Sequence, residues 1–322
     1  MVALDLWKLR LSMLGTLAVI IGISTLGFTT LLYVFGALNL FSLIILVASF
    51  NLLQWLIAPY LVEAMYRAKP ADPVEHSNLY GMVERLSARS GISPPSLMIA
   101  EIPIPNAFAY GSPLTGSRVA VTRGLLRHLE PEEVEAVIGH EFGHIRHRDV
   151  QVMMFVSLLP SLFFILARYA LYSSYYGDRR GDRRSGGLAL ASTISMFVYF
   201  ILLLFTLGLS RLREYYADQH SVIVVEEGSR KLSEGLAKIS MGTWRTMRQA
   251  GAPAFSGFKT LFISDPDRAA QDAASVSTYI KSDEALVREI MSRKVTGADQ
   301  LLELFSTHPN IVKRIIALRG QM

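Results

Sequence analysis

The sequence contains no charged side chain between Arg10 and Glu63. A soluble domain rarely leaves so long an apolar stretch uninterrupted, whereas two membrane helices of roughly 20 residues each would use it fully. A weak break, Gly-Ala-Leu-Asn at residues 36–39, divides the stretch into two arms. We therefore expect residues 11–59 to form a transmembrane helical hairpin with a very short turn. The stretch is too long for a signal peptide and no small-residue cleavage site follows it, so we expect it to be retained.

Composition and charge agree with a membrane protein. Hydrophobic residues make up 51% of the chain and charged residues 18%, against roughly a quarter charged in soluble domains. Lys8 and Arg10 precede the hairpin and Arg67 and Lys69 follow it, which predicts that both ends are cytoplasmic under the positive-inside rule. The net charge is +5, but the basic residues form no patch interleaved with aromatics, so we expect no nucleic-acid partner.

The sequence has no cysteine. This excludes disulfide scaffolds, thiolate metal sites and cysteine nucleophiles. Any metal must therefore be held by nitrogen and oxygen ligands.

Mixed and apolar segments alternate after the hairpin. Asp72-Pro73 predicts the start of an amphipathic helix that runs to about Ala88. Residues 97–100, 107–110 and 118–122 are strand candidates around a turn-rich segment at 111–116, and we interpret them as a small antiparallel sheet. Pro131 and the two glutamates after it predict the first turn of a helix that passes through His140 and continues into an apolar run.

Two apolar runs, residues 150–167 and 188–209, are a third and fourth membrane-helix candidate. A polar loop at residues 177–184 separates them. If both runs span, its four arginines and two aspartates lie outside, contrary to the positive-inside rule; the alternatives are a hairpin that lies partly in the membrane or one that packs on other helices with its loop inside. Short helices are predicted at 231–239, 283–293, 299–305 and 311–318, and a long loop at 250–275, which is rich in Gly, Pro, Ser and Asp. The predicted fold class is thus a mainly α membrane protein with a small antiparallel β-sheet.

Residues 140–144 read His-Glu-Phe-Gly-His, which is the H-E-x-x-H pattern. The spacing of four places His140 and His144 on one helical face, a turn apart, where they can share a tetrahedral zinc ion. Glu141 lies where its carboxylate can reach a water on the metal, so it is the natural general base. The alternative is a surface helix with scattered histidines, but apolar residues at 136–138 and 142 indicate a half-buried helix and favour the metal.

A catalytic zinc ion needs a third protein ligand, and residues 211–218 offer one. Glu214 and Asp218 share a helical face through their four-residue spacing. In this arrangement Glu214 binds zinc, and Asp218 accepts a hydrogen bond from the far ring nitrogen of a ligating histidine. On spacing alone, a solvated acidic pair beside Arg211 and Arg213 is an equal alternative.

Geometry favours Glu214 as the third ligand. The midpoint between His144 and Glu214 falls at Arg179, inside the polar loop. If both apolar runs are helical, they form an antiparallel hairpin that returns Glu214 to the level of His144. His147 is a weaker candidate, because it would lie about 10 Å from His140 along the helix axis, too far to share one ion at ligand distances near 2 Å.

Further motifs join this set: Pro-Asn-Ala-Phe at residues 105–108, Thr-His-Pro at 307–309 and Arg-Ile at 314–315. Together they resemble the HtpX family of membrane gluzincin proteases, relatives of the CAAX prenyl endopeptidases, over nearly the whole chain. One departure is Asn310, which stands where the family often has a second proline.

The resemblance implies zinc ligands His140, His144 and Glu214, one Zn²⁺ per subunit, and catalytic Glu141. It implies a multi-pass protein of the cell membrane with its active site on the cytoplasmic side. It also implies polypeptide substrates and a role in clearing damaged or misfolded membrane proteins.

Two substrate contacts follow from the resemblance. Asn106, Ala107 and Phe108 would belong to an edge strand that pairs with an extended substrate, since backbone pairing tolerates many sequences; the alternative is an ordinary hairpin strand. His308 would stabilise the oxyanion of the tetrahedral intermediate, or His308-Pro309 simply starts the last helix.

The sequence thus predicts a membrane-bound zinc metalloendopeptidase that hydrolyses peptide bonds with zinc-activated water and Glu141 as general base. Residues 1–62 would form the amino-terminal transmembrane hairpin, 63–150 and 211–322 the two parts of a gluzincin-like protease domain, and 151–210 the second apolar hairpin. The alternatives are a narrow-specificity processing protease, such as a CAAX-type endopeptidase, and a non-catalytic membrane scaffold stabilised by zinc. Glu141 argues against the scaffold, because a structural zinc site closes with four protein ligands.

Overall fold

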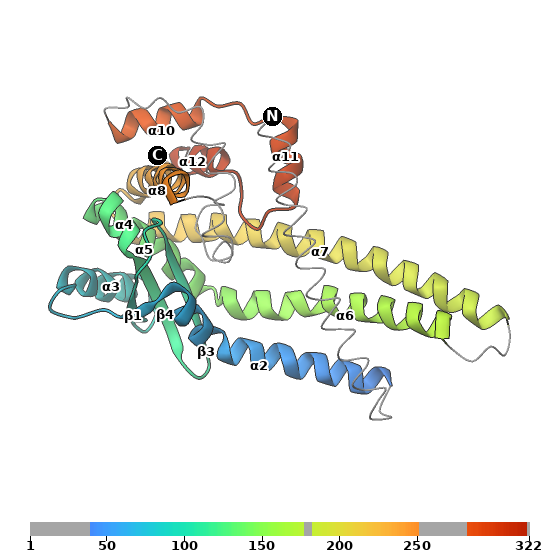
Figure 1. Ribbon diagram of the computed structural model, residues 1–322. Helices are drawn as coiled ribbons and strands as arrows, with labels where there is room; N and C mark the ends of the chain where they lie inside the picture. Colours follow the sequence, from blue (N-terminus) through green and yellow to red (C-terminus); the bar gives the residue numbers. More distant parts are fainter. Residues whose placement is uncertain (1–38, 177–181, 251–281, 321–322) are drawn as a thin grey trace. The chain divides into compact units, whose positions relative to one another are not determined.

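The structure, a computed structural model, describes residues 39–176, 182–250 and 282–320 (Figure 1). The first arm of the predicted amino-terminal hairpin, residues 177–181 of the polar loop and the predicted loop after Ala250 lie outside the described residues. The helices are α2 (Leu40–Tyr66), α3 (Ser77–Ser90), α4 (Arg123–His128), α5 (Pro131–Arg146), α6 (Asp149–Tyr176), α7 (Asp182–Val224), α8 (Gly228–Ala250), α10 (Asp283–Met291), α11 (Gly297–Leu304) and α12 (Ile311–Arg319). The strands are β1 (Ala68–Pro70), β2 (Ser96–Ala100), β3 (Ala107–Ser112) and β4 (Gly116–Thr122).

The chain divides into two compact units. The hairpin unit comprises residues 1–54 and 155–203, and the sheet unit comprises residues 55–154 and 204–322. All of the predicted metal-site residues belong to the sheet unit.

In the hairpin unit, α6 and α7 lie side by side. The Ser192 hydroxyl donates a hydrogen bond of 2.8 Å to the carbonyl oxygen of Ala167, and the rings of Phe164 and Tyr199 have centroids 5.3 Å apart. Both contacts join positions about equally far from the loop between the helices, which confirms the predicted antiparallel hairpin. Among the described residues, Ile44–Tyr66 and Gly187–Val224 are long and apolar enough to cross a membrane.

The second helix of this hairpin is longer than predicted. α7 runs for 43 residues without interruption, so residues 182–184, predicted as loop, belong to it. The sequence contains no proline between Asp182 and Val224, so nothing removes a helical N–H and ends the helix early. Glu214 therefore lies on the same helix as the apolar run.

The sheet unit contains a four-stranded sheet in the order β1-β2-β4-β3. The predicted small sheet is confirmed, but it is mixed, because β2 and β4 pair in parallel while the other two pairs are antiparallel. The cause lies in β4, whose residues 119–121 have no exposed surface at all. Such a strand suits the centre of a sheet, so β3 takes the edge beyond it.

The two faces of the sheet pack against different partners because side chains alternate along a strand. Leu97, Ile99 and Val119 belong to the main core, which also includes residues of α3, α5, α8, α10 and α12. On the other face, Phe108 and its neighbours form a smaller cluster with Tyr66, the last residue of α2.

The two predicted helix starts in this unit have different outcomes. α5 begins at Pro131 as predicted, and the Glu133 carboxylate accepts a hydrogen bond of 2.8 Å from the N–H of Glu130. The predicted start at Asp72-Pro73 is wrong, because α3 begins only at Ser77. The Asp72 carboxylate instead accepts the N–H groups of the two residues after Pro73 and closes a turn.

A short break separates α5 from α6, where the sequence predicted a continuous path. α5 ends at Arg146, and Arg148 adopts a left-handed φ of 53° before Asp149 starts α6. In an uninterrupted helix, residues 144 and 149 would point roughly 140° apart around the axis. The break instead returns the Asp149 carboxylate to His144.

Two glycines let α5 approach α7 closely. A Cβ atom on Gly143 would lie 2.7 Å from the Cα atom of Ala217, and one on Gly139 would lie 3.2 Å from the hydroxyl oxygen of Ser221. That hydroxyl donates a hydrogen bond of 2.6 Å to the carbonyl oxygen of Ala136. The glycine in the second variable position of the H-E-x-x-H pattern therefore sets the spacing between the two helices that carry the predicted ligands.

We predict that Gly143→Ala lowers the stability of the protein by roughly 1–3 kcal/mol, because the added methyl group meets backbone rather than a movable side chain. It should also weaken metal binding, because α5 and α7 must separate. The thermal unfolding midpoint in detergent and the zinc content after purification would measure both effects.

Gly81→Ala is the matched control, since its Cβ would meet only the guanidinium of Arg85 at 3.4 Å. Alanine favours a helix over glycine by up to about 1 kcal/mol, so this change should be neutral or slightly stabilising. If the two variants unfold at the same temperature, the close contact does not set the helix spacing.

Candidate metal centre

The two histidines of the motif both direct their Nε2 atoms toward one point. His140 is fully buried and His144 is partly buried. Their Nε2 atoms lie 3.2 Å apart, and their rings meet edge to face with centroids 4.8 Å apart. Together with the Glu141 carboxylate, their ligand atoms fall within 4.8 Å of one another. The four-residue spacing therefore gives the predicted geometry.

Glu214 of α7 brings its carboxylate to the same point. Its two oxygens lie 3.7 Å from Nε2 of His140 and 3.5 Å from Nε2 of His144. A tetrahedral ion at about 2.0–2.1 Å from each donor would hold the donors about 3.3–3.4 Å apart. The three donors therefore fit one metal ion with small adjustments, whereas a solvated acidic pair at this position does not agree with the burial of Glu214, which is 5% exposed.

Asp218 lies one helical turn beyond Glu214 and contacts the other nitrogen of His140. Its Oδ1 atom is 2.9 Å from Nδ1 of that ring. Arg314 of α12 holds the same carboxylate with two nitrogens, at 2.9 and 2.6 Å. A third nitrogen of Arg314 lies 3.2 Å from Oε2 of Glu214. This guanidinium is 1% exposed and therefore fixes both acidic residues of α7 at once.

A second carboxylate, which the sequence patterns did not reveal, contacts His144 in the same way. Asp149 Oδ2 lies 2.5 Å from Nδ1 of His144 and 2.9 Å from the Arg213 guanidinium. Each histidine thus has a buried aspartate on its Nδ1 atom and an arginine behind that aspartate. Such partners fix the ring orientation and raise the basicity of Nε2. A signal was present in the acidic residue at the start of the apolar run, but only the break at Arg148 makes its contact possible.

The Glu141 carboxylate is buried beside the two histidines. Its Oε2 atom accepts a hydrogen bond of 2.7 Å from the backbone N–H of Ala109 in β3. Burial raises the pKa of Glu141 above its ordinary value, while the neighbouring histidines act against that shift. A raised pKa suits a group that must take up and release a proton.

His308 faces the site from the segment before α12. Its Nδ1 atom lies 3.3 Å from Oε2 of Glu214. The last helix begins at Ile311, and Asn310 is its N-cap, with a side-chain oxygen that accepts the N–H of Val312. His308-Pro309 therefore lies before the helix and does not form its first turn, and Asn310 supplies a cap that a proline side chain cannot provide.

The predicted substrate strand lies at the sheet edge. Ala107 and Phe108 begin β3, and Asn106 directly precedes it. The Asn106 carbonyl accepts the N–H of Thr122 from β4, and pairing alternates along an antiparallel strand. The backbone groups of Ala107 and Ala109 therefore face the free edge, while those of Asn106 and Phe108 face β4.

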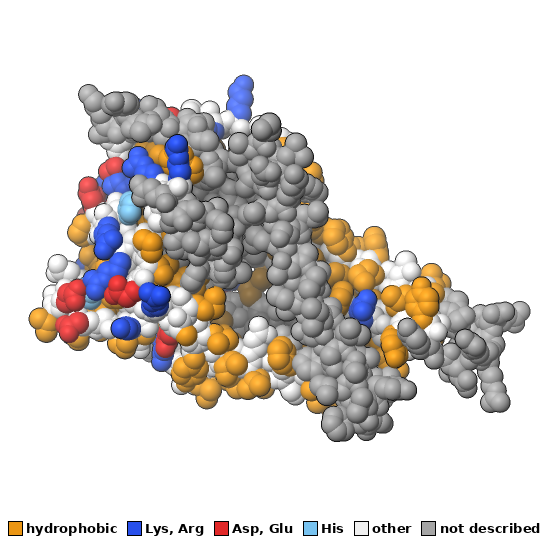
Figure 2. Space-filling view, viewed as in Figure 1, with side chains coloured by type: hydrophobic (Ala, Val, Ile, Leu, Met, Phe, Trp, Pro, Cys, Tyr) orange, Lys and Arg blue, Asp and Glu red, His pale blue; other side chains and the backbone are white. Residues whose placement is uncertain are grey.

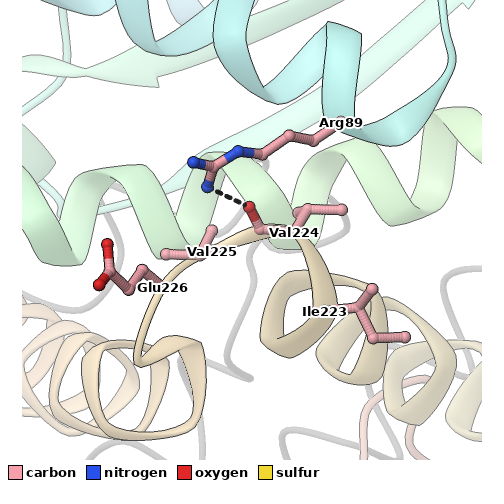
Figure 3. A pocket seen from close by; sticks show the side chains of 5 residues that line it. All are labelled: Arg89, Ile223, Val224, Val225 and Glu226. Atoms are coloured by element: carbon pink, nitrogen blue, oxygen red, sulfur yellow. Dashed lines mark hydrogen bonds between the residues drawn. The ribbon is translucent and has the colours of Figure 1, made fainter.

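A surface pocket elsewhere in the sheet unit has no part in this centre. Arg89, Glu226 and residues 223–225 line it, and Arg89 donates a hydrogen bond of 2.8 Å to the carbonyl oxygen of Val224 (Figure 3). Val224 lies ten residues beyond Glu214 on α7, or roughly 15 Å along the helix. The contact caps the end of α7, because a cation there offsets the helix dipole.

Comparison with known proteins places the chain in a family. The sequence profile of Peptidase family M48 matches residues 73–322. The chain belongs to peptidase family M48. As a member of this family it is a metal-dependent protease, and its apolar helices indicate that it associates with membranes.

Relatives of this M48 protein extend the likeness beyond the matched residues. It is 40% identical to the protease HtpX homologue of Thermoplasma acidophilum over 82% of this chain and 80% of that protein. It is 37% identical to the protease HtpX homologue of Thermoplasma volcanium over 96% and 93% of the two chains. The crystal structure of S. mikatae Ste24p has a similar fold, with a TM-score of 0.57 and 17% identity over 98% of this chain and 67% of that one.

We predict that Asp149→Ala lowers the affinity for zinc by about 10- to 100-fold, because His144 loses the partner that orients it. Asp149→Asn should fall between this variant and the wild type, since its amide oxygen still accepts the Nδ1–H. Competition against a chromogenic chelator would give the affinities. Equal zinc affinity in all three proteins would show that Asp149 does not support the site.

Proposed function

We propose that this protein is a membrane-embedded zinc metalloendopeptidase that hydrolyses peptide bonds of membrane or misfolded proteins. One observation carries the proposal: two imidazole nitrogens of α5 and the Glu214 carboxylate of α7 converge to 3.2–3.7 Å from one another, with the buried Glu141 carboxylate directly beside them. In this proposal residues 63–150 and 211–322 form the protease domain, and residues 1–62 and 151–210 anchor it in the membrane.

The donor set supports zinc as the metal. Two histidines and one glutamate are a known ligand combination for catalytic zinc, and three protein ligands leave one position open for water or substrate. We assign the ligand roles to His140, His144 and Glu214, with one ion per subunit. When bound, zinc would polarise the scissile carbonyl and lower the pKa of a water molecule, so that the water can lose a proton and attack the carbonyl carbon.

The residues of the chain supply the proton transfers. Glu141 accepts a proton as the water oxygen bonds to the carbonyl carbon, and it returns that proton to the nitrogen when the carbon–nitrogen bond breaks. Asp218 and Asp149 keep the two imidazoles in the tautomer that leaves Nε2 free for the metal. His308 is close enough to Glu214 to position its carboxylate. The alternative role of His308 is to stabilise the oxyanion of the tetrahedral intermediate.

The free edge of β3 supports a role in substrate binding. Ala107 presents backbone groups on the side away from β4, and an extended polypeptide can pair with them without regard to its side chains. Phe108 supports the strand itself and leaves the free edge to its neighbours, since its ring packs against that of Tyr66 with centroids 4.7 Å apart. Sequence-tolerant pairing suits a protease that acts on many damaged proteins.

We predict that Glu141→Gln lowers peptide hydrolysis by roughly 10²- to 10⁴-fold, because the amide cannot take up a proton, and leaves bound zinc unchanged. Glu214→Ala should lose both zinc and activity. Purified variants in detergent would be compared for metal content and for cleavage of an unfolded protein.

Glu132→Gln, in the first turn of the same helix, is the matched control. Its carboxylate is 40% exposed and pairs with Arg230 rather than with the metal-site residues, so its metal content and hydrolysis should match the wild type. Full metal content in Glu214→Ala would contradict the assigned ligand set. Undiminished hydrolysis by Glu141→Gln would contradict the general base.

We further propose that the protein is a multi-pass protein of the cell membrane with its active site in the cytoplasm. Arg67 and Lys69 directly follow the apolar part of α2, and basic residues that flank a membrane helix favour the cytoplasmic side.

The cysteine-free sequence permits a direct test of this orientation. Val74 is 87% exposed in the sheet unit, so a single Val74→Cys substitution offers an accessible thiol. We predict that an impermeant maleimide labels it in inverted vesicles but leaves it unlabelled in intact cells. Labelling in intact cells would place the active site outside.

A further inference from the structure

The β3–β4 hairpin lies along the last turns of α2, within the sheet unit (Figure 1). Three contacts join the two elements, and their order shows that β3 and α2 run in opposite directions. The Ser112 hydroxyl donates a hydrogen bond of 3.3 Å to the Leu56 carbonyl oxygen, and the Tyr110 hydroxyl donates one of 3.2 Å to the Glu63 carboxylate. The rings of Phe108 and Tyr66 have centroids 4.7 Å apart. The turn of the hairpin, residues 111–117, is therefore level with Leu56. The other end of β3 is level with the end of α2.

The level of Leu56 lies inside the apolar part of α2. The candidate membrane span is Ile44–Tyr66, and Glu63 is the first charged residue of this helix. Glu63 forms an ion pair with Arg118 of β4, which marks a polar level. Leu56 precedes Glu63 by seven residues, or roughly 10 Å along the helix.

The turn is built for an apolar environment. Residues 111–117 carry no charge. The N–H groups of Ser112 and Leu114 bond to the hydroxyls of Thr115 and Ser112, and the N–H of Thr115 bonds to the Ser112 carbonyl. Pro113 has no N–H to satisfy. Backbone donors in lipid must be satisfied within the protein, and these are.

The outer surface of the turn is apolar as well. Leu114 is 65% exposed at its tip, and on the same side of the polar level Ile57, Tyr60 and Leu61 of α2 are 41–53% exposed. On the face shown in Figure 2, charged side chains gather at the α3 end of the sheet unit and hydrophobic side chains dominate over α2. The turn thus continues an apolar surface that already belongs to a candidate membrane helix.

We propose that the β3–β4 turn is a membrane-contact element that inserts Pro113 and Leu114 into the interfacial region of the bilayer beside α2. Amphipathic protein segments bury apolar side chains about 5–10 Å into this boundary, which matches the depth of the turn below the Glu63–Arg118 pair.

A consequence for substrates rests on the proposed function. Ala109, whose N–H bonds to Glu141, precedes Ser112 by three residues, or about 10 Å along the strand. The free edge of β3 would therefore run from the bilayer surface to the general base. The preferred substrates would be polypeptide segments that have just emerged from the membrane.

A depth measurement on the full chain tests the membrane contact. Single cysteines are introduced as Leu114→Cys, Leu61→Cys and Val74→Cys in a Glu141→Gln background, labelled with an environment-sensitive fluorophore and reconstituted into vesicles of phosphatidylcholine and phosphatidylglycerol. Leu61 is the membrane reference. Val74 is the water reference, because its neighbour Glu75 pairs with Arg123 beyond the opposite end of β4.

We expect the label at position 114 to resemble that at 61, with blue-shifted emission and strong quenching by nitroxide lipids but weak quenching by iodide. A label at 114 that resembles the one at 74 would overturn the proposal. The readout needs no catalysis, so that result would leave the proposed zinc protease activity standing. Failure of that activity would appear instead in the Glu141→Gln and Glu214→Ala comparison.

Discussion

The proposed metal centre depends on the close approach of α5 and α7. The histidines lie on one helix and the third donor on another, more than sixty residues later in the chain, so the distance between two helix axes decides whether they meet. Gly139 and Gly143 reduce that distance by removing side chains where Ala217 and Ser221 approach. A glycine inside a helix costs roughly 0.5–1 kcal/mol relative to alanine. Here the cost is offset by contact between backbones that brings Glu214 within reach of both imidazoles.

Charge balance explains why two arginines accompany the acidic residues around this site. Glu141, Glu214, Asp218 and Asp149 bring four carboxylates into a buried volume, and Arg213 and Arg314 supply two positive charges. A divalent cation would make the ionised set neutral. Buried charges without partners are strongly unfavourable, so metal binding should contribute to the stability of the fold as well as to catalysis.

Much of this arrangement was predictable from local patterns. The H-E-x-x-H spacing predicted the imidazole pair. Because His144 and Glu214 are equally far from Arg179 in the sequence, a helical hairpin that turns there was predicted to return Glu214 to the level of His144. The start of α5 at Pro131 followed from its acidic first turn. These features depend on helix periodicity and length, which a sequence displays directly.

The missed features depend on how elements meet. The Asp149 contact requires a left-handed residue at Arg148, and nothing about an arginine predicts that conformation. Arg314 lies far from the motif in sequence, and its role follows only from the packing of α12. The parallel pairing of β2 with β4 reflects competition among strands for the centre of the sheet, which the separate strand patterns do not reveal.

The unbroken course of α7 has a mechanical consequence. The apolar run and the carboxylate of Glu214 share one continuous helix of 43 residues, so they rotate as a single rod. Successive residues differ by roughly 100° around such a rod, and a twist of that size would turn the carboxylate away from the imidazoles. A rotation of the apolar run about its axis would therefore carry the Glu214 carboxylate with it.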